Sequence, residues 1–263
     1  MEKGKDLEPR KFKPRKKEDP QLIFGRRAVL EAFHANKTVE KLFIQKDLKG
    51  DLIKELKDYV RQTKTSLSLV PQEKLKRFTL KNHQGVVGFL SLIEYSSLHH
   101  EIAACYENGI NPLVTVLDEV TDVRNIGSIA RSAECAGVNA IVLPSKGSGQ
   151  INSDAMKASA GALNHIAVCR EHNLFETCRY LKDSGLQILA CTEKGSKNYY
   201  EVDFTTPTVL IMGSEDEGIS NQLLKIADQE IRIPMVGKIG SLNVSNATSI
   251  LLFEALRQRN QSK

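Results

Sequence analysis

The sequence predicts an α/β protein in two parts, a small N-terminal α/β sandwich and a larger C-terminal unit with an open parallel sheet. Strand-like apolar runs alternate with segments of helical periodicity along most of the 263 residues. The run LVTVLDEV at 113–120 is apolar enough to be buried on both faces, as strands of parallel sheets are. Hydrophobic residues make up 41% and charged residues 26%, which is typical of a globular protein, and no apolar run is long enough to cross a membrane.

A basic segment lies near the N-terminus. Residues 10–17 read RKFKPRKK, with Pro9, Pro14 and Pro20 close by. Such a segment cannot bury apolar surface, so residues 1–20 are predicted to form a disordered arm. The arm either contacts the phosphates of RNA or DNA or serves only as a solubilising tail. The net charge of +5 is compatible with an anionic partner but does not require one.

The cysteines and the N-terminus favour a cytoplasmic protein. The basic N-terminus lacks the apolar stretch of a secretory signal. Five cysteines are scattered without a CxxC pair, which favours reduced thiols over disulfides or a zinc site. The histidines show no ligand spacing either, so no metal is predicted.

The N-terminal domain is predicted over residues 21–93. Its predicted elements are a glycine turn and helix (IFGRRAVLEAFHAN), a strand at 39–45, a helix at 51–63, a strand at 66–70, a short helix (QEKLKRF), and a turn with a strand (NHQGVVGFLSL). The turn at 82–85 and the arginines beside Gly25 could face a ligand. A lone histidine at a glycine turn, such as His83, is more often a local hydrogen-bonding device than a catalyst.

A linker with a helix is predicted over 94–111, and the second domain over 112–263. Strands are predicted at 113–120, 140–144, 165–169, 187–191 and 208–212, and helices after Gly127, at 154–163, at 174–184 and from Val244. In the apolar run at 231–235, any strand is expected to stop at Pro234 or to run along an edge of the sheet. Ligands of open parallel sheets bind at the carboxyl ends of the strands. Three loops meet this condition, at 121–127, 213–218 and 234–243.

The last of these loops leads into the C-terminal helix. Gly237 and Gly240 give its backbone unusual freedom. Either Ser241 or Asn243 is a plausible N-cap for the helix that begins at Val244. The free N–H groups of such a helix end can bind a carboxylate or a phosphate, although a glycine loop that only caps an amphipathic helix has the same pattern.

The three loops also carry motifs of a known family. NIGSIARSA (125–133), GSEDEGI (213–219) and IPMVGKIGSLNVSNA (233–247) resemble the three motifs of the SpoU, or TrmH-type, branch of the SPOUT RNA methyltransferases. FGRRAVLEA and HQGVVG resemble that family's N-terminal substrate-binding domain. The likeness extends from Phe24 to Arg259. It departs from the family at Val123, where proline is more common, and in the long basic arm.

The resemblance implies a C-terminal domain with a deep trefoil knot, S-adenosylmethionine bound in the knot, and a homodimer whose active site lies at the subunit interface. It implies cofactor contacts from Gly213, Ile233, Met235, Ser241 and Leu242. It implies a reaction centre formed by Asn125, Arg131, Glu215, Ser241 and Asn243. It implies RNA contacts from Arg26, Arg27, His83, Gln84 and Arg124.

Arg131 raises a chemical question. The implied reaction moves a methyl group from a sulfonium to a ribose 2′-hydroxyl, which must lose its proton. Arginine is proposed as the base in such enzymes, but a pKa above about 12 leaves almost no neutral form. Arg131 could instead hold the neighbouring phosphate and stabilise the developing alkoxide, or merely form a salt bridge. Glu215 could orient Arg131, accept a hydrogen bond or shape the cofactor loop, and Asn125 could anchor the nucleotide or cap a helix.

We therefore expect an RNA 2′-O-ribose methyltransferase. The two-domain layout is most similar to the subgroup that modifies a guanosine of 23S ribosomal RNA, a target that rests on analogy alone. The nearest alternative is the same reaction on transfer RNA. A knotted RNA-binding protein that has lost catalysis and acts in ribosome assembly is a second alternative, which cofactor binding would distinguish.

Overall fold

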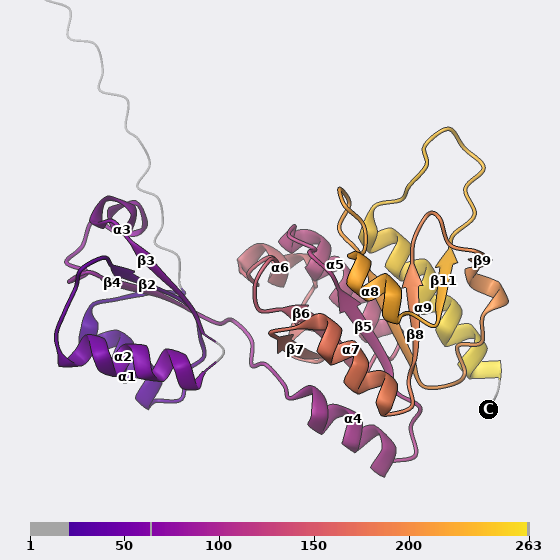
Figure 1. Cartoon of the computed structure of the whole chain (residues 1–263), viewed down its shortest axis with the longest axis horizontal. Helices are drawn as coiled ribbons and strands as arrows, with labels where there is room; N and C mark the ends of the chain where they lie inside the picture. The colour runs from indigo at the N-terminus through magenta and orange to yellow at the C-terminus, as the bar shows by residue number, and fades with distance from the viewer. Residues whose placement is uncertain (1–20, 64, 262–263) are drawn as a thin grey trace, which may run out of the picture.

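The computed structural model describes residues 21–63 and 65–261, which form two α/β units joined by a connecting segment at residues 91–97 (Figure 1). The N-terminal unit carries a four-stranded sheet and the C-terminal unit a seven-stranded sheet. The predicted α/β class with a parallel sheet is confirmed. The predicted arm at residues 1–20 lies outside the described residues. Within the described ranges, no helix combines the length and the apolar character needed to span a membrane.

The N-terminal sheet has helices on both faces. Its strand order is β1 (Leu22–Phe24), β4 (Val86–Leu90), β2 (Val39–Gln45) and β3 (Ser66–Val70). β2 and β3 run parallel, and β4 is antiparallel to β1 and β2. α1 (Arg26–His34) and α2 (Asp51–Gln62) cover one face, around buried Leu42 and Leu56. α3 (Gln72–Phe78) covers the other face, where Leu75 packs with Phe43 (Figure 1).

The strands of the C-terminal sheet pair in parallel. Their order is β7 (Ala167–Glu171), β6 (Ala140–Pro144), β5 (Leu113–Leu117), β10 (Thr208–Met212), β8 (Gln187–Cys191), β11 (Gln229–Arg232) and β9 (Lys197–Asn198). The last residues of the three central strands are in register, with Leu117 beside Met212 and Met212 beside Cys191. The segments that follow these strands therefore leave the sheet along one edge.

Helices cover both faces of this sheet. α5 (Val123–Cys135), α6 (Ser153–Ala158) and α9 (Val244–Gln261) pack on one face around a cluster that includes Ile129 and Leu251. α4 (Leu98–Glu107), α7 (Leu174–Asp183) and α8 (Asn221–Ile226) pack on the other, with Leu98 and Leu181 in its core. The helix predicted within the linker, α4, is thus part of the C-terminal core.

The far end of α9 is fixed to the edge where the strands begin. The Arg259 guanidinium donates hydrogen bonds to the carbonyls of Phe204 (2.8 Å), Asn111 (2.7 Å) and Thr206 (3.0 Å). Gln258 donates to the carbonyl of Val202 (3.0 Å) and accepts from the backbone N–H of Phe204 (2.8 Å). The final helix is therefore held at its last turn by backbone groups from distant segments.

The helix after β5 begins earlier than expected. The Asp122 carboxylate caps it by accepting from the backbone N–H of Arg124 (2.8 Å), so α5 already includes Asn125 and Gly127. Gly127 allows close packing, because a Cβ there would lie 2.4 Å from the Ala155 carbonyl of α6. Two residues expected in a loop therefore stand on a rigid helix.

Several other boundaries also differ. In the apolar run at 231–235, the strand begins earlier, at Gln229, and ends at Arg232, before Pro234, which has no N–H to donate. The helix predicted at 154–163 ends at Ala158 and is followed by a 3-10 turn at Ala162–Asn164, and the next strand begins at Ala167. β1, β9, α8 and the turn at Tyr199–Glu201 were not predicted, because they are short.

Candidate active site

Three polar side chains from distant parts of the chain meet beyond the carboxyl ends of β5, β10 and β11. Asn125 Nδ2 donates to Glu215 Oε1 (3.0 Å), and Asn243 Nδ2 lies 2.6 Å from the same oxygen. Asn243 Nδ2 is also 3.1 Å from Asn125 Oδ1. We call Asn125, Glu215 and Asn243 the amide–carboxylate cluster. It unites three of the predicted catalytic residues, one from each predicted loop.

Glu215 is presented by a tight hairpin. Ser214 and Gly218 exchange backbone hydrogen bonds of 3.1 Å in both directions, and the Ser214 hydroxyl accepts from the backbone N–H of Glu217. A Cβ at Gly213 would lie 2.1 Å from the Gly218 backbone, so glycine is required for the hairpin itself. Glu215 and its acidic neighbours at the tip are exposed.

Asp118 anchors the far side of this hairpin. It is 6% exposed, and its Oδ2 accepts from the backbone N–H of Ser220 (2.7 Å). Its own N–H donates to the carbonyl of Met212 (2.8 Å), which extends the β5–β10 ladder. Asp118 was not among the predicted site residues. The only signal was its place directly after a buried strand.

Asn243 also caps α9. Its Oδ1 accepts from the backbone N–H (2.9 Å) and the hydroxyl (2.6 Å) of Ser245. Asn243, rather than Ser241, is therefore the N-cap. Ser241 is exposed, and none of the described residues forms a hydrogen bond with its side chain. Because Oδ1 of Asn243 accepts hydrogen bonds at the start of the helix, its Nδ2 is the group that faces the other two members of the cluster.

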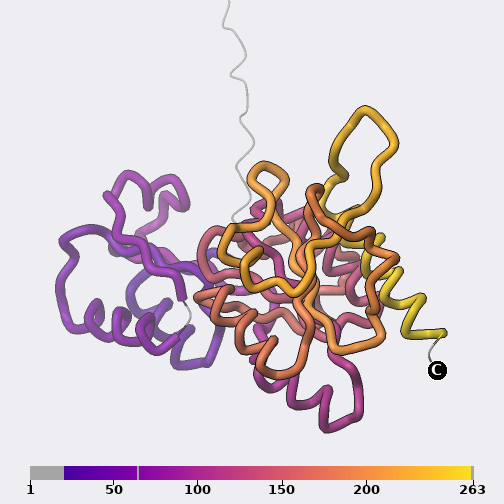
Figure 2. Tube along the Cα trace, turned by 45° about the vertical axis from the view of Figure 1, so that its right-hand side comes forward, coloured from indigo at the N-terminus to yellow at the C-terminus, as the bar shows by residue number. Residues whose placement is uncertain are grey.

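The loop between β11 and α9 exposes apolar side chains. Met235 is 40%, Ile239 75% and Val236 105% exposed, whereas Ile233 and Leu242 are half-buried. Figure 2 shows this segment, in gold near the yellow end of the chain, extending away from the rest of the C-terminal unit. Of these side chains, Ile233, Met235 and Leu242 are the predicted contacts with a ligand, for which apolar surface beside the cluster is suitable.

Arg131 does not join the amide–carboxylate cluster. It lies six residues after Asn125 on α5, which places the two side chains about 120° apart around the helix axis. It is exposed, and no described residue accepts a hydrogen bond or ion pair from it. Arg131 shares its face of α5 with Arg124, which lies 3.8 Å from the Asp122 carboxylate, and with Ser128. These arginines therefore form an exposed basic face beside the cluster.

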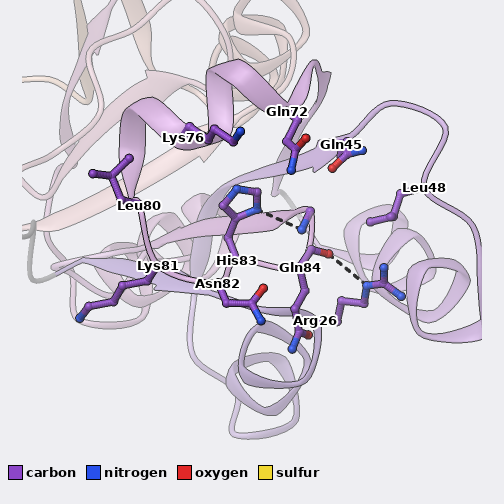
Figure 3. A pocket seen from close by; sticks show the side chains of 11 residues that line it. Arg26, Gln45, Leu48, Gln72, Lys76, Leu80, Lys81, Asn82, His83 and Gln84 are labelled. Atoms are coloured by element: carbon purple, nitrogen blue, oxygen red, sulfur yellow. Dashed lines mark hydrogen bonds between the residues drawn. The ribbon is translucent and has the colours of Figure 1, made fainter.

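Three of the predicted RNA contacts of the N-terminal unit, Arg26, His83 and Gln84, line a hollow of ≈ 550 Å³ (Figure 3). α3 lies along one side with Gln72 and Lys76, and Arg26 and Asn82 lie on the opposite side. The hollow is lined by Arg26, Gln45, Leu48, Gln72, Lys76, Leu80, Lys81, Asn82, His83, Gln84 and Gly85. Amides and cations dominate this lining, and these are groups that bind base edges and phosphates.

The turn below the hollow is stabilised from within. His83 is buried, and its Nδ1 accepts from the backbone N–H of Gly85 (3.0 Å). Arg26 Nε donates to the carbonyl of Gln84 (3.1 Å). Arg27 is exposed and lines an adjacent hollow with Arg26. In this structure, His83 thus stabilises the turn through a local hydrogen bond.

Two further features concern metals and thiols. The residues described by the structure include no group of three histidine, cysteine, aspartate or glutamate side chains able to hold a metal ion. None of the five cysteines, all of which lie within the described residues, forms a disulfide, and burial raises the pKa of Cys178 and of Cys191 to about 12. Neither thiol is a nucleophile at neutral pH, because the reactive thiolate is not populated.

Comparisons with known protein families cover both units of the chain. Residues 112–253 match the SpoU rRNA Methylase family, and residues 22–96 match the RNA 2′-O ribose methyltransferase substrate-binding family. A protein of Staphylococcus saprophyticus, assigned by name to the TrmH family of tRNA/rRNA methyltransferases, is 35% identical over 91% of this chain and 96% of its own length.

Two solved structures are similar over most of the chain. The SpoU methyltransferase AviRb from Streptomyces viridochromogenes, in complex with the cofactor AdoMet, is 25% identical, with a TM-score of 0.58 over 91% of this chain and 90% of that one. The AdoMet-bound rRNA methyltransferase from Sinorhizobium meliloti is 27% identical, with a TM-score of 0.55 over 90% of this chain and 86% of that one.

Proposed function

Because this chain belongs to the SpoU family of RNA methylases, we propose that it transfers a methyl group from S-adenosylmethionine to the 2′-hydroxyl of a ribose in RNA. The observation that carries the proposal is the amide–carboxylate cluster. Its three members stand in the three motifs of the family and share hydrogen bonds although they are 28 to 118 residues apart.

The residues at this edge of the sheet fit the methyl donor. S-adenosylmethionine supplies, when bound, a methyl group on a positively charged sulfur. The acidic hairpin at 213–218 offers negative charge to such a cation, and Ile233, Met235 and Leu242 offer apolar surface. We further propose that the last helix follows a knotted path, as the resemblance implies, and that Gly213 and Ser241 border the same pocket.

Glu215 is suited to hold the ribose hydroxyl. Its Oε1 accepts from two amides, while none of the described residues donates to Oε2. The second oxygen can therefore accept a hydrogen bond from the 2′-hydroxyl and take up its proton as the hydroxyl reacts. Asn125 and Asn243 fix the carboxylate, and Arg131 stabilises the negative charge that develops on the ribose oxygen.

The orientation of Arg131 favours a shared site. The exposed face of α5 directs Arg131 away from the cluster of its own chain. We propose that two copies form a homodimer in which Arg131 of one copy lies at the amide–carboxylate cluster of the other copy. Each active site then contains residues from both subunits, and neither subunit alone is complete.

Mixing two inactive variants tests this arrangement. Arg131→Ala and Glu215→Ala are each expected to be inactive, but their mixed dimers contain one intact site. After co-expression, methyl transfer should recover to about a quarter of the wild-type rate, since about half of the dimers are mixed and each has one working site. Mixtures of Arg131→Ala with Arg131→Lys serve as the control, since they cannot form an intact site. Failure of the first mixture to recover would show that Arg131 does not act across subunits.

The RNA substrate is proposed from the family. We propose a guanosine of 23S ribosomal RNA as the target, in the cytoplasm, with the domain of residues 21–93 holding RNA beside the catalytic domain of residues 112–263. The basic arm at residues 1–20 adds phosphate contacts. Mapping ribose methylation in ribosomal and transfer RNA from a deletion strain tests the target, and loss of a methyl group from transfer RNA alone would overturn it. Calorimetry with S-adenosylmethionine tests the catalytic role against an assembly role, which does not require the cofactor.

A further inference from the structure

A buried carboxylate joins the two units of the molecule. Glu40 lies on β2 of the N-terminal unit and is 2% exposed. Its Oε1 accepts hydrogen bonds from the Tyr95 hydroxyl and from Ser91 Oγ, at 3.2 Å for the latter. Its Oε2 lies 3.9 Å from Nη2 of Arg170, which belongs to β7 at the edge of the C-terminal sheet. Figure 1 places β7 on the side of the C-terminal unit that faces the N-terminal unit.

Tyr95 completes this contact from the connecting segment. The Arg170 guanidinium carbon lies 4.8 Å from the centre of the Tyr95 ring, so the arginine is stacked on the tyrosine while it faces the carboxylate. The side chains of Arg170 and Glu40 are 10% and 1% exposed. Burial, followed by the nearby Glu40 charge, raises the pKa of the Tyr95 phenol, so the hydroxyl remains a donor at neutral pH. We call Glu40, Tyr95 and Arg170 the junction cluster.

Hydrogen bonds to backbone carbonyls of both units also hold this junction together. Gln21 Nε2 donates to the carbonyl of Leu90 in the N-terminal unit (2.8 Å) and to that of Ile151 in the C-terminal unit (3.3 Å). The backbone N–H of Ser96 donates to the carbonyl of Val168 (2.9 Å) and forms a parallel bridge beside β7. The connecting segment is therefore paired with the edge of the sheet and does not behave as a flexible tether.

The energetics of burial favour one orientation of the two units. A buried carboxylate is costly unless it keeps its hydrogen bonds and its countercharge. Rotation of one unit would separate Glu40 from Arg170 and Tyr95, which come from outside the N-terminal unit. The junction cluster therefore makes other orientations of the two units unfavourable, even where its net contribution to the free energy of unfolding is modest.

We propose that Glu40, Tyr95 and Arg170 are positioning residues, which fix the RNA-binding hollow at a set distance from the amide–carboxylate cluster and thereby select the ribose that is methylated. This inference rests on the proposed function. An RNA bound in the hollow can bring only one ribose to the amide–carboxylate cluster, because the two units do not rotate freely. This is the ribose whose distance along the RNA matches the separation between the hollow and the cluster. A loosened junction would present neighbouring riboses as well.

Mild substitutions test the proposal. Tyr95→Phe removes the hydroxyl that reaches Glu40 but keeps the ring beneath Arg170, and Glu40→Gln removes the charge but keeps the shape. The matched controls are Tyr106→Phe, which loses a 2.7 Å hydrogen bond to the Ser184 carbonyl within the C-terminal unit, and Glu176→Gln, which loses an exposed ion pair with Arg179. Both controls remove the same chemical groups without touching the junction.

The first measurement is the position and rate of methylation on ribosomal RNA from a deletion strain. The junction variants should methylate riboses next to the normal one, and kcat at the normal ribose should fall on the order of tenfold or more, as expected for a misplaced substrate. KM for S-adenosylmethionine should stay unchanged, since the cofactor pocket lies elsewhere. If Tyr95→Phe and Glu40→Gln match their controls in both position and rate, the proposal is overturned.

The second measurement does not depend on methylation. Hydrogen exchange of the purified full chain should show the β7 edge and the connecting segment protected together in the wild type, and both should exchange faster in the junction variants but not in the controls. If the wild type methylates no RNA but exchange responds in this way, the proposed function fails and the fixed junction stands. If exchange is unchanged as well, the junction cluster has no positioning role.

Discussion

The amide–carboxylate cluster and the junction cluster each place a glutamate among polar groups from distant segments, but they differ in burial. Glu215 is exposed and accepts from two neutral amides, whereas Glu40 is 2% exposed and faces an arginine and a tyrosine. An exposed network gains little stability, because water competes for every group. A buried one is costly to break, because its charge is left without water or partner. Similar contacts therefore cost little to break at the surface and much in the interior.

The largest expected effect separates the two glutamates by stability. Glu40→Ala leaves Arg170 without its buried carboxylate, so we expect the free energy of unfolding to fall by about 3–5 kcal/mol. Glu215→Ala should change it by no more than about 1 kcal/mol, since the residue is exposed. Urea denaturation followed by circular dichroism measures both. Equal losses for the two variants would remove the distinction drawn from burial.

The second prediction concerns the rate of the chemical step. Arg131→Ala and Arg131→Lys should keep the fold and cofactor affinity but lose methyl transfer on the order of a hundredfold or more, because lysine retains the charge without the planar fork. Arg124→Ala, one heptad away on the same face, is the matched control and should weaken RNA binding more than the rate. Single-turnover methylation at saturating RNA and cofactor distinguishes these effects. A near-normal rate for Arg131→Ala would exclude it from the chemistry.

The third prediction concerns the cofactor. Met235→Ala should weaken S-adenosylmethionine binding on the order of tenfold, as expected when about 1–2 kcal/mol of apolar contact is lost. Val236→Ala is the neighbouring control, because Val236 is fully exposed and is not among the predicted contacts. Isothermal calorimetry measures both affinities. Gly213→Val would be a poor test, since a Cβ at this position collides with the Gly218 backbone whether or not a cofactor binds.

The smallest expected effect concerns the basic arm. Deletion of residues 1–20 should weaken RNA binding and reduce the slope of its dependence on salt, because fewer phosphates are neutralised. Cofactor affinity should remain unchanged, as should stability at the junction. Filter binding at several salt concentrations provides the measurement. A salt slope equal to that of the full chain would leave the arm with only a solubilising role.

The sequence was sufficient for most elements but not for the contacts between them. Strands such as Val39–Gln45 and Ala140–Pro144 were predicted with their observed bounds, because apolar runs between polar turns determine strands locally. Asn125, Glu215 and Asn243 were predicted as site residues from their motifs. That Arg131 points away from them depends on where α5 begins, and the Asp122 cap that sets this start was not recognised.

The junction cluster could not be predicted from the sequence. Glu40 lies beside Lys41 near the start of a strand, Tyr95 lies in a connecting segment and Arg170 lies on an edge strand, and none of these places is unusual by itself. Their relationship arises only when two separately folded sheets come together. The periodicity of apolar residues along each element contains no information about contacts between the two sheets.

The anchoring of α9 has a consequence for protein synthesis. Asn243 at the start of this helix completes the amide–carboxylate cluster, and the helix is held in place by Arg259 near its end. Because chains fold as they leave the ribosome from the N-terminus onward, the hollow of the N-terminal unit, where we propose that RNA binds, can form long before the cluster exists. A nascent or truncated chain should therefore be able to bind RNA without modifying it, and methylation should begin only when translation of the chain has ended.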